Sequence, residues 1–129
     1  TGSPHYVKFV NNIDALDVYN EGKNIRYNAR FKEEGTNVNF IERTENELVV
    51  RTYERGVENE TLSCGTGVTA AALVAAIANK STSKNNCAIK TLGGNLNIKF
   101  EKVLDNHFYN IWLEGSATFV FETSIELTL

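Results

Sequence analysis

The sequence contains no methionine, one proline and one tryptophan in 129 residues. Because translation starts with methionine, a chain that opens with Thr1 is expected to be part of a longer polypeptide. No apolar run approaches the ~20 residues that a membrane-spanning helix needs, and no signal-peptide pattern opens the chain. No membrane partner and no export are therefore expected.

Cysteine and basic charge are also scarce. Two cysteines exclude a disulfide-dense secreted scaffold, so a reducing cytoplasm is the simpler expectation, and a single bridge is the alternative. A net charge of −3 excludes a strongly basic nucleic-acid-binding surface. The cysteines and histidines are too scattered for a zinc site, and no phosphate-binding lysine motif or dinucleotide fingerprint is present. We therefore expect no metal and no cofactor.

Apolar alternation predicts a series of strands at residues 6–10, 37–42, 48–53, 87–91, 95–100, 108–113 and 118–122. Turn residues separate several of them, at 45–46, 93–94, 105–106 and 114–115. A looser helical periodicity predicts a helix over residues 16–26, and residues 79–84 read as a polar loop. Cys87 and Trp112 fall in strands and are expected in the core.

The alanine-rich segment 68–78 carries no charged residue. Alanine is the best helix former, and a helix that is apolar nearly all round should be buried on all sides. The sheet must then curl around this helix. We therefore expect one domain over residues 1–129 of a mixed α/β (α+β) class, in which a curved, largely antiparallel sheet wraps around a central buried helix.

The segment Ser-Cys-Gly-Thr-Gly at residues 63–67 immediately precedes that helix. The unpaired N–H groups of a helix start favour negative charge, which makes Cys64 a candidate base or nucleophile. The N–H groups of Gly65 and Thr66 are placed to hold a carboxylate or phosphate. The competing interpretation is that Cys64 is a small buried hydrophobic residue and the glycines only form a turn.

Charged and titratable residues elsewhere are individually weak signals. Glu54 and Arg55 follow an apolar strand, where they either form a solvated ion pair or assist Cys64 and grip a carboxylate. His5, close to the start of the chain, is by itself more typical of a structural or exposed histidine.

Taken together, Tyr-Glu-Arg-Gly at 53–56 and Ser-Cys-Gly-Thr-Gly at 63–67 resemble the C-terminal half of the diaminopimelate epimerase family. Gly-Ser-Pro-His at 2–5, Gly-Thr-Asn-Val-Asn-Phe at 35–40 and the tail at 115–121 extend this resemblance over nearly the whole chain. The pairing of Glu-Arg-Gly with Cys-Gly-Thr-Gly is specific, whereas any one of these pieces alone is not.

The resemblance implies a two-domain enzyme, each domain a curled sheet around a helix, with the active site between them. It implies interconversion of LL- and meso-diaminopimelate, in lysine and peptidoglycan precursor synthesis, without a pyridoxal cofactor. One cysteine from each domain acts: one thiolate removes the α-proton, and the other thiol protonates the opposite face.

Carried over by position, the resemblance makes Cys64 one of the two acid/base cysteines and Glu54 its hydrogen-bonding partner. Gly65 and Thr66 would give N–H groups to the α-carboxylate. His5 would partner the cysteine of the other domain.

The distal end of the substrate would be recognised by Arg55, which would hold its carboxylate, and by Asn37. Ser3 stands where the family usually has asparagine, and a hydroxyl replaces only part of the hydrogen bonding of an amide. Its substrate contact is therefore the weakest part of the resemblance.

The chain has no second Cys-Gly motif, so the N-terminal domain with the other cysteine is expected to precede Thr1. The segment 6–10 should then pair with preceding residues or with a second copy, as in a homodimer. This fragment alone is expected to have little epimerase activity.

Two other functions remain open from the sequence. One is a proline or hydroxyproline racemase or a phenazine-pathway isomerase of the same fold, although Arg55 favours a second carboxylate and Cys64 disfavours the phenazine enzyme. The other is a non-catalytic anion-binding module, which would need neither Cys64 nor Glu54.

Overall fold

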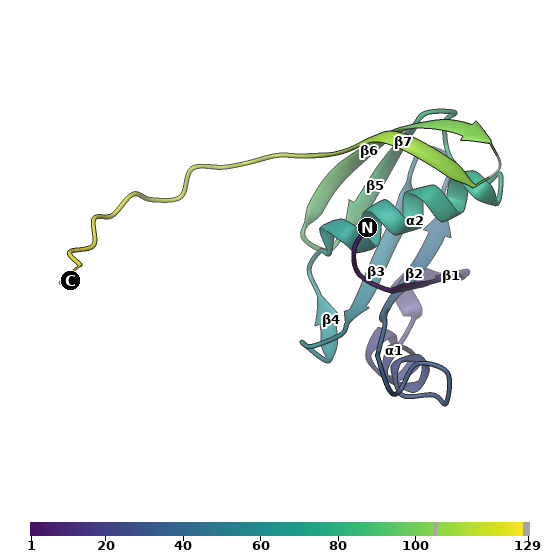
Figure 1. The fold of residues 1–129 in the computed structure, drawn as a ribbon, viewed down its shortest axis with the longest axis horizontal. Coiled ribbons are helices and arrows are strands. Elements are labelled where there is room, and N and C mark those ends of the chain that lie inside the picture. The colour runs from purple at the N-terminus through teal and green to yellow at the C-terminus, as the bar shows by residue number, and fades with distance from the viewer. Residues whose placement is uncertain (105, 128–129) are drawn as a thin grey trace.

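A computed structural model describes residues 1–104 and 106–127. Within them, seven strands form one sheet of order β1-β2-β3-β5-β6-β7, with β4 paired to β3 (Figure 1). The strands are β1 (His5–Phe9), β2 (Asn37–Arg43), β3 (Leu48–Glu54), β4 (Asn59–Thr61), β5 (Asn86–Thr91), β6 (Gly94–Leu104) and β7 (His107–Gly115). The helices are the 3-10 helix η1 (Ile13–Ala15), α1 (Val18–Arg26) and α2 (Gly65–Ile77).

The sheet is curled and largely antiparallel, as expected. β1 runs parallel to β2 and β3 parallel to β5, whereas β2–β3, β3–β4, β5–β6 and β6–β7 are antiparallel. Irregularities between Lys99 and Glu101 and between Lys102 and Leu104 shift the β6–β7 register, and such bulges increase the local bend and twist. Figure 1 shows α2 lying along the hollow of this sheet.

Helix α2 forms the centre of the main core and contacts both halves of the curled sheet, from β1 to β7. Ala71 and Ala75 are fully buried, as the uncharged alanine run predicts. The expectation of burial on every side is wrong, however, because the sheet encloses only part of the helix. A stripe at helical spacing stays partly or fully exposed: Thr66, Ala70, Leu73 and Ile77.

Helix α1 covers a second, smaller core against β2 and β3. The helix begins at Val18 rather than at residue 16, because the carboxylate of Asp17 accepts a hydrogen bond from the N–H of Asn20 at 3.0 Å and caps the first turn. Gly22 lies directly against the side chain of Tyr53, where a Cβ atom would clash. In the described residues, no helix is long and apolar enough to cross a membrane.

Three expectations at the C-terminal end need correction or comment. Residues 118–122 form no strand: the tail leaves the sheet without a ladder partner among the described residues, although its sequence alternates as a strand does (Figure 1). Trp112 lies on the terminal strand of the sheet and is 66% exposed, whereas Cys87 is fully buried as expected. Of the predicted turn at 105–106, Asp105 lies outside the described residues.

Candidate active site

Cys64 is the N-cap residue of α2, so the predicted position at a helix start is confirmed. Its backbone is extended and its carbonyl accepts the first helical hydrogen bond, from Val68 N–H at 2.9 Å. The thiol is largely buried, with Sγ 3.6 Å from the hydroxyl of Thr66. The N–H groups of Gly65 and Thr66 belong to the first turn and therefore have no intrahelical acceptor.

A cavity of about 470 Å³ opens at this helix start. Four of the predicted site residues line it together: Glu54, Cys64, Gly65 and Thr66. Thr1, Ser63, Thr69 and Leu113 complete the lining, so that an apolar side chain from β7 faces the polar helix start. The cavity therefore combines a thiol, a carboxylate and free backbone donors within one hollow.

Glu54 is the last residue of β3, and its position is fixed from the neighbouring strand. Its Oε2 accepts a hydrogen bond from the hydroxyl of Thr61 on β4 at 2.9 Å. The three-residue β4 carries no strand signal in its sequence, so Thr61 was not expected near the site. Glu54 also lines the cavity, and its other carboxylate oxygen accepts no hydrogen bond from the described residues.

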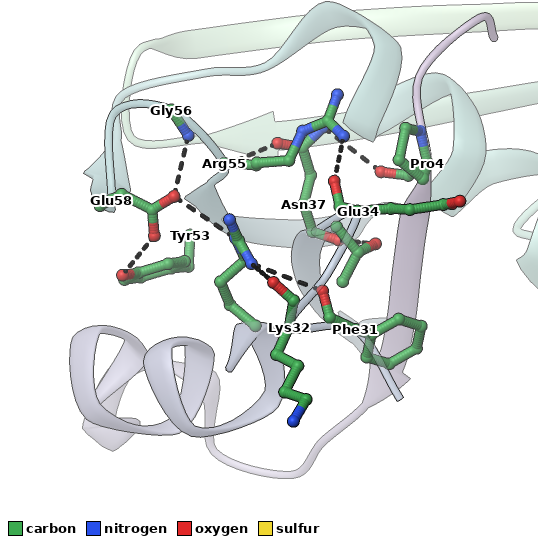
Figure 2. Close-up of polar contacts among 11 residues, drawn as sticks. Pro4, Phe31, Lys32, Glu34, Asn37, Tyr53, Arg55, Gly56 and Glu58 are labelled. Carbon is green, nitrogen blue, oxygen red and sulfur yellow. Dashed lines mark hydrogen bonds and ion pairs between the residues drawn. The ribbon is translucent and has the colours of Figure 1, made fainter. Parts of the chain in front are cut away.

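Asn37, Ser3 and Arg55 form a second cluster that does not line the cavity of Cys64. Figure 2 shows Asn37 and Arg55 of this cluster. The Asn37 amide nitrogen donates to Ser3 Oγ at 3.0 Å and to the Pro4 carbonyl at 3.4 Å. Its Oδ1 accepts from the backbone N–H of Arg55 at 2.8 Å. Asn37 thus joins the start of β1 to the end of β3.

The Arg55 guanidinium extends from this cluster toward the loop before β2. Nη1 donates to the carbonyl of Glu34 at 2.7 Å, and Figure 2 shows the side chain reaching toward that loop. Gly35, with a φ of +74°, packs directly against the Arg55 side chain, and any Cβ there would clash with it. The glycine therefore makes room for the arginine.

His5 is the first residue of β1 and is half-buried. Burial is the main cause that lowers the pKa of His5; the positive chain terminus and Arg55 lower it further, whereas Glu54 raises it. These charges place His5 in the same electrostatic environment as Glu54 and Arg55. Its Nε2 atom is enclosed but has no hydrogen-bond partner among the residues that the structure describes.

One residue that contacts this region, Asn39, was not predicted from the sequence. Asn39 is fully buried on β2, and its amide nitrogen lies 3.1 Å from His5 Nδ1. The available signal was the alternation Asn37-Val38-Asn39, which places two amides on one face of an otherwise apolar strand. No group of three or more metal-ligating side chains is placed to hold a metal ion in the described part of the chain.

The model of the diaminopimelate epimerase family matches residues 1–120. A diaminopimelate epimerase from Flavobacterium psychrophilum is 49% identical over 126 residues, which are 97% of this chain and 48% of that protein. One from Chlorobaculum tepidum is 47% identical over 128 residues, 98% of this chain and 48% of that protein. The chain therefore spans about half the length of the curated relatives it matches.

A phenazine biosynthesis protein of the PhzF family from Bacillus anthracis has a similar fold, with a TM-score of 0.56 and 20% sequence identity. The match covers 84% of this chain and 35% of that structure, and at this identity it shows the fold alone. The family model and the sequence relatives lead to one conclusion: the chain belongs to the diaminopimelate epimerase family.

Proposed function

We propose that this chain supplies one half of the active site of an epimerase that inverts the α-carbon of diaminopimelate by proton transfer between two cysteines. The observation that carries the proposal is the cavity in which Cys64, Glu54 and the first N–H groups of α2 meet. A chain of this family with that arrangement has a base, an anion-binding helix start and a carboxylate at one place.

The helix start is the part of the cavity that would hold the α-carboxylate of the substrate. The N–H groups of Gly65 and Thr66 point outward from the first turn, where the helix dipole also favours negative charge. As the α-proton leaves, charge moves from the α-carbon into the carboxylate, and donors fixed in advance stabilise it without reorganising. Cys64, which directly precedes these two residues in the chain, is the group that takes or gives the proton on one face.

Glu54 would act on Cys64 rather than on the substrate. Its side chain lines the same cavity, and the hydroxyl of Thr61 fixes one carboxylate oxygen. The free oxygen would accept a hydrogen bond from the thiol when Cys64 is protonated, and would help to move its proton. This role is that of a general acid/base partner.

The second cluster would recognise the distal end of the substrate. Arg55 offers a guanidinium that suits a carboxylate, and the distal carboxylate distinguishes diaminopimelate from proline. Asn37 fixes the Arg55 backbone through its Oδ1 and contacts Ser3 through its nitrogen. We propose that Asn37 and Ser3 together position the distal amino-acid group beside Arg55.

The other half of the site would come from residues that precede Thr1 in the complete protein, including the second cysteine beside His5. Three apolar or unpaired surfaces could contact that half of the protein: the exposed α2 stripe ending at Ile77, the outer edge of β1, and the tail 116–127. Phe119 and Phe121 in the tail are both highly exposed. A second copy of the chain is the alternative occupant of the β1 edge.

The experiment is steady-state epimerisation of LL-diaminopimelate by the full-length protein carrying Cys64→Ser, with Cys87→Ser as the matched control. A hydroxyl is a far weaker acid than a thiol at neutral pH, and general acid/base groups contribute roughly 10²–10⁴-fold. Cys64→Ser should therefore lower kcat by at least about 10²-fold, and Cys87→Ser should change it little. Equal rates for both variants would refute the role of Cys64, and faster turnover of proline than of diaminopimelate would refute the substrate.

A further inference from the structure

Asn39 makes hydrogen bonds on three sides from a fully buried position. Its Nδ2 lies 3.3 Å from the carbonyl of Tyr6 and 3.1 Å from His5 Nδ1. Its Oδ1 accepts from the hydroxyl of Thr52, directly opposite on β3, at 3.0 Å. The amide therefore connects β1, β2 and β3 at the level of the helix start.

The carbonyl of Tyr6 fixes which way this amide faces. A carbonyl oxygen only accepts hydrogen bonds, so the Asn39 atom beside it must be the NH₂ group. The Thr52 hydroxyl then donates to the remaining oxygen. The opposite orientation would set two oxygens against each other in a buried place, which costs the full penalty of an unpaired polar group.

The same NH₂ group has a second hydrogen, and this hydrogen faces His5 Nδ1. A ring nitrogen that accepts this bond carries no proton. In a neutral imidazole the proton must then be on the other nitrogen, Nε2. Nε2 is enclosed and unpartnered among the described residues, so its N–H lacks the acceptor that a buried donor normally has.

We infer that Asn39 is a positioning residue that holds neutral His5 in the Nε2–H tautomer, so that His5 donates a hydrogen bond to the companion thiolate rather than accepting its proton. The donor role of His5 rests on the proposed function, in which His5 faces the second cysteine. With Nδ1 occupied by the amide and Nε2 already protonated, the ring has no free lone pair for the proton of a thiol.

Helix α2 prevents the amide from rotating away. Gly67 lies so close that a Cβ atom there would collide with Asn39 Oδ1, and it would also lie 3.2 Å from Cys64 Sγ. The amide thus packs between His5 on one side and the first turn of α2 on the other.

The charged groups that act on His5 are consistent with a neutral ring near pH 7. Burial, the positive chain terminus and Arg55 all lower the pKa of His5, and Glu54 opposes them. The terminal charge exists only where the chain starts at Thr1, whereas burial, the largest cause, remains in a longer protein.

The test is long-range ¹H–¹⁵N NMR of the full-length protein, which distinguishes a protonated ring nitrogen from an unprotonated one. We expect His5 to show an unprotonated Nδ1 and a protonated Nε2 above its pKa. His107, which is exposed, serves as an internal reference and should show the average of two exchanging tautomers. A His5 spectrum with a protonated Nδ1, or one averaged like that of His107, would overturn the inference and leave the proposed function intact.

Two variants test the cause. Asn39→Asp replaces the donor by an acceptor, so His5 should switch to a protonated Nδ1 and its pKa should rise. Thr52→Val removes the donor that orients the amide and should increase the population of the Nδ1–H tautomer. This second variant provides the test if Asn39→Asp does not fold. Asn95→Asp, exposed at the start of β6, is the matched control and should change nothing.

The donor role is tested by the pH dependence of alkylation of the companion cysteine. A hydrogen bond to a charged group is worth about one pKa unit or more, so the neutral variant Thr52→Val, which shifts His5 toward the Nδ1–H tautomer, should lower the thiolate fraction at pH 7 by up to about tenfold. If the tautomer switches as expected but no cysteine of the companion half changes its reactivity, the donor role is overturned, and with it the proposed pairing of His5 with that thiol.

Discussion

Because Gly67 lies so close to Asn39, we expect a Gly→Ala substitution in this helix to have an unusual effect on stability. Gly→Ala within a helix normally stabilises a protein by about 1 kcal/mol, because alanine loses less backbone entropy on folding. At Gly67 the added methyl would collide with Asn39 Oδ1, and this side chain is fully buried and held by three neighbours. Overpacking of this kind costs about 1–3 kcal/mol, and each displaced hydrogen bond about 1 kcal/mol more.

We therefore expect Gly67→Ala to lower the free energy of unfolding by about 2 kcal/mol, measured by urea denaturation. Gly65→Ala in the same helix is the matched control, because its Cβ meets only the flexible end of Leu113, at 3.0 Å. It should leave stability unchanged or raise it by up to about 1 kcal/mol. In a double-mutant cycle, Asn39→Ala should recover about 1–2 kcal/mol of the loss at Gly67. A Gly67→Ala protein as stable as the wild type would refute the close packing and weaken the argument for a fixed amide.

Two further predictions concern titration and reactivity. Burial lowers the pKa of His5 below its ordinary 6.5, so the unfolded chain binds the proton more readily, and stability falls as the pH drops below about 6.5. His5→Gln should reduce this loss in urea denaturation between pH 7 and pH 5, and an unchanged slope would contradict it. Burial also raises the pKa of Cys87, so peptide mapping after iodoacetamide treatment should find Cys87 unmodified until denaturant is added; early labelling would count against its place in the core.

The curled sheet was predictable because the alanine run at 68–78 has no polar face, which left few ways to pack it. The expected enclosure on all sides was not correct, because a helix that is apolar all round gives no indication of which side stays open. The position of Cys64 at the helix start was predictable from the glycines around it. Both signals come from residues that are neighbours in the sequence, and a single sequence shows patterns of this local kind.

The remaining features depend on contacts between distant residues. The alternation at 118–122 is typical of a strand, but a strand needs a partner, and the described residues offer none to this tail. In the sequence, Asn39 is only one polar residue within a predicted strand. Its importance depends on Tyr6, Thr52 and Gly67, which come from three other elements and meet only in the fold.

The central claim is that Cys64 moves the α-proton on one face of the substrate. The most direct measurement is deuterium incorporation at the α-carbon in D₂O, for the full-length protein and its Cys64→Ser variant, starting from each stereoisomer. We expect the wild type to exchange the α-proton of both isomers. The variant should lose epimerisation by orders of magnitude and exchange at most the isomer whose α-proton faces the companion thiol. Wild-type rates of epimerisation and exchange in the Cys64→Ser protein would contradict the account.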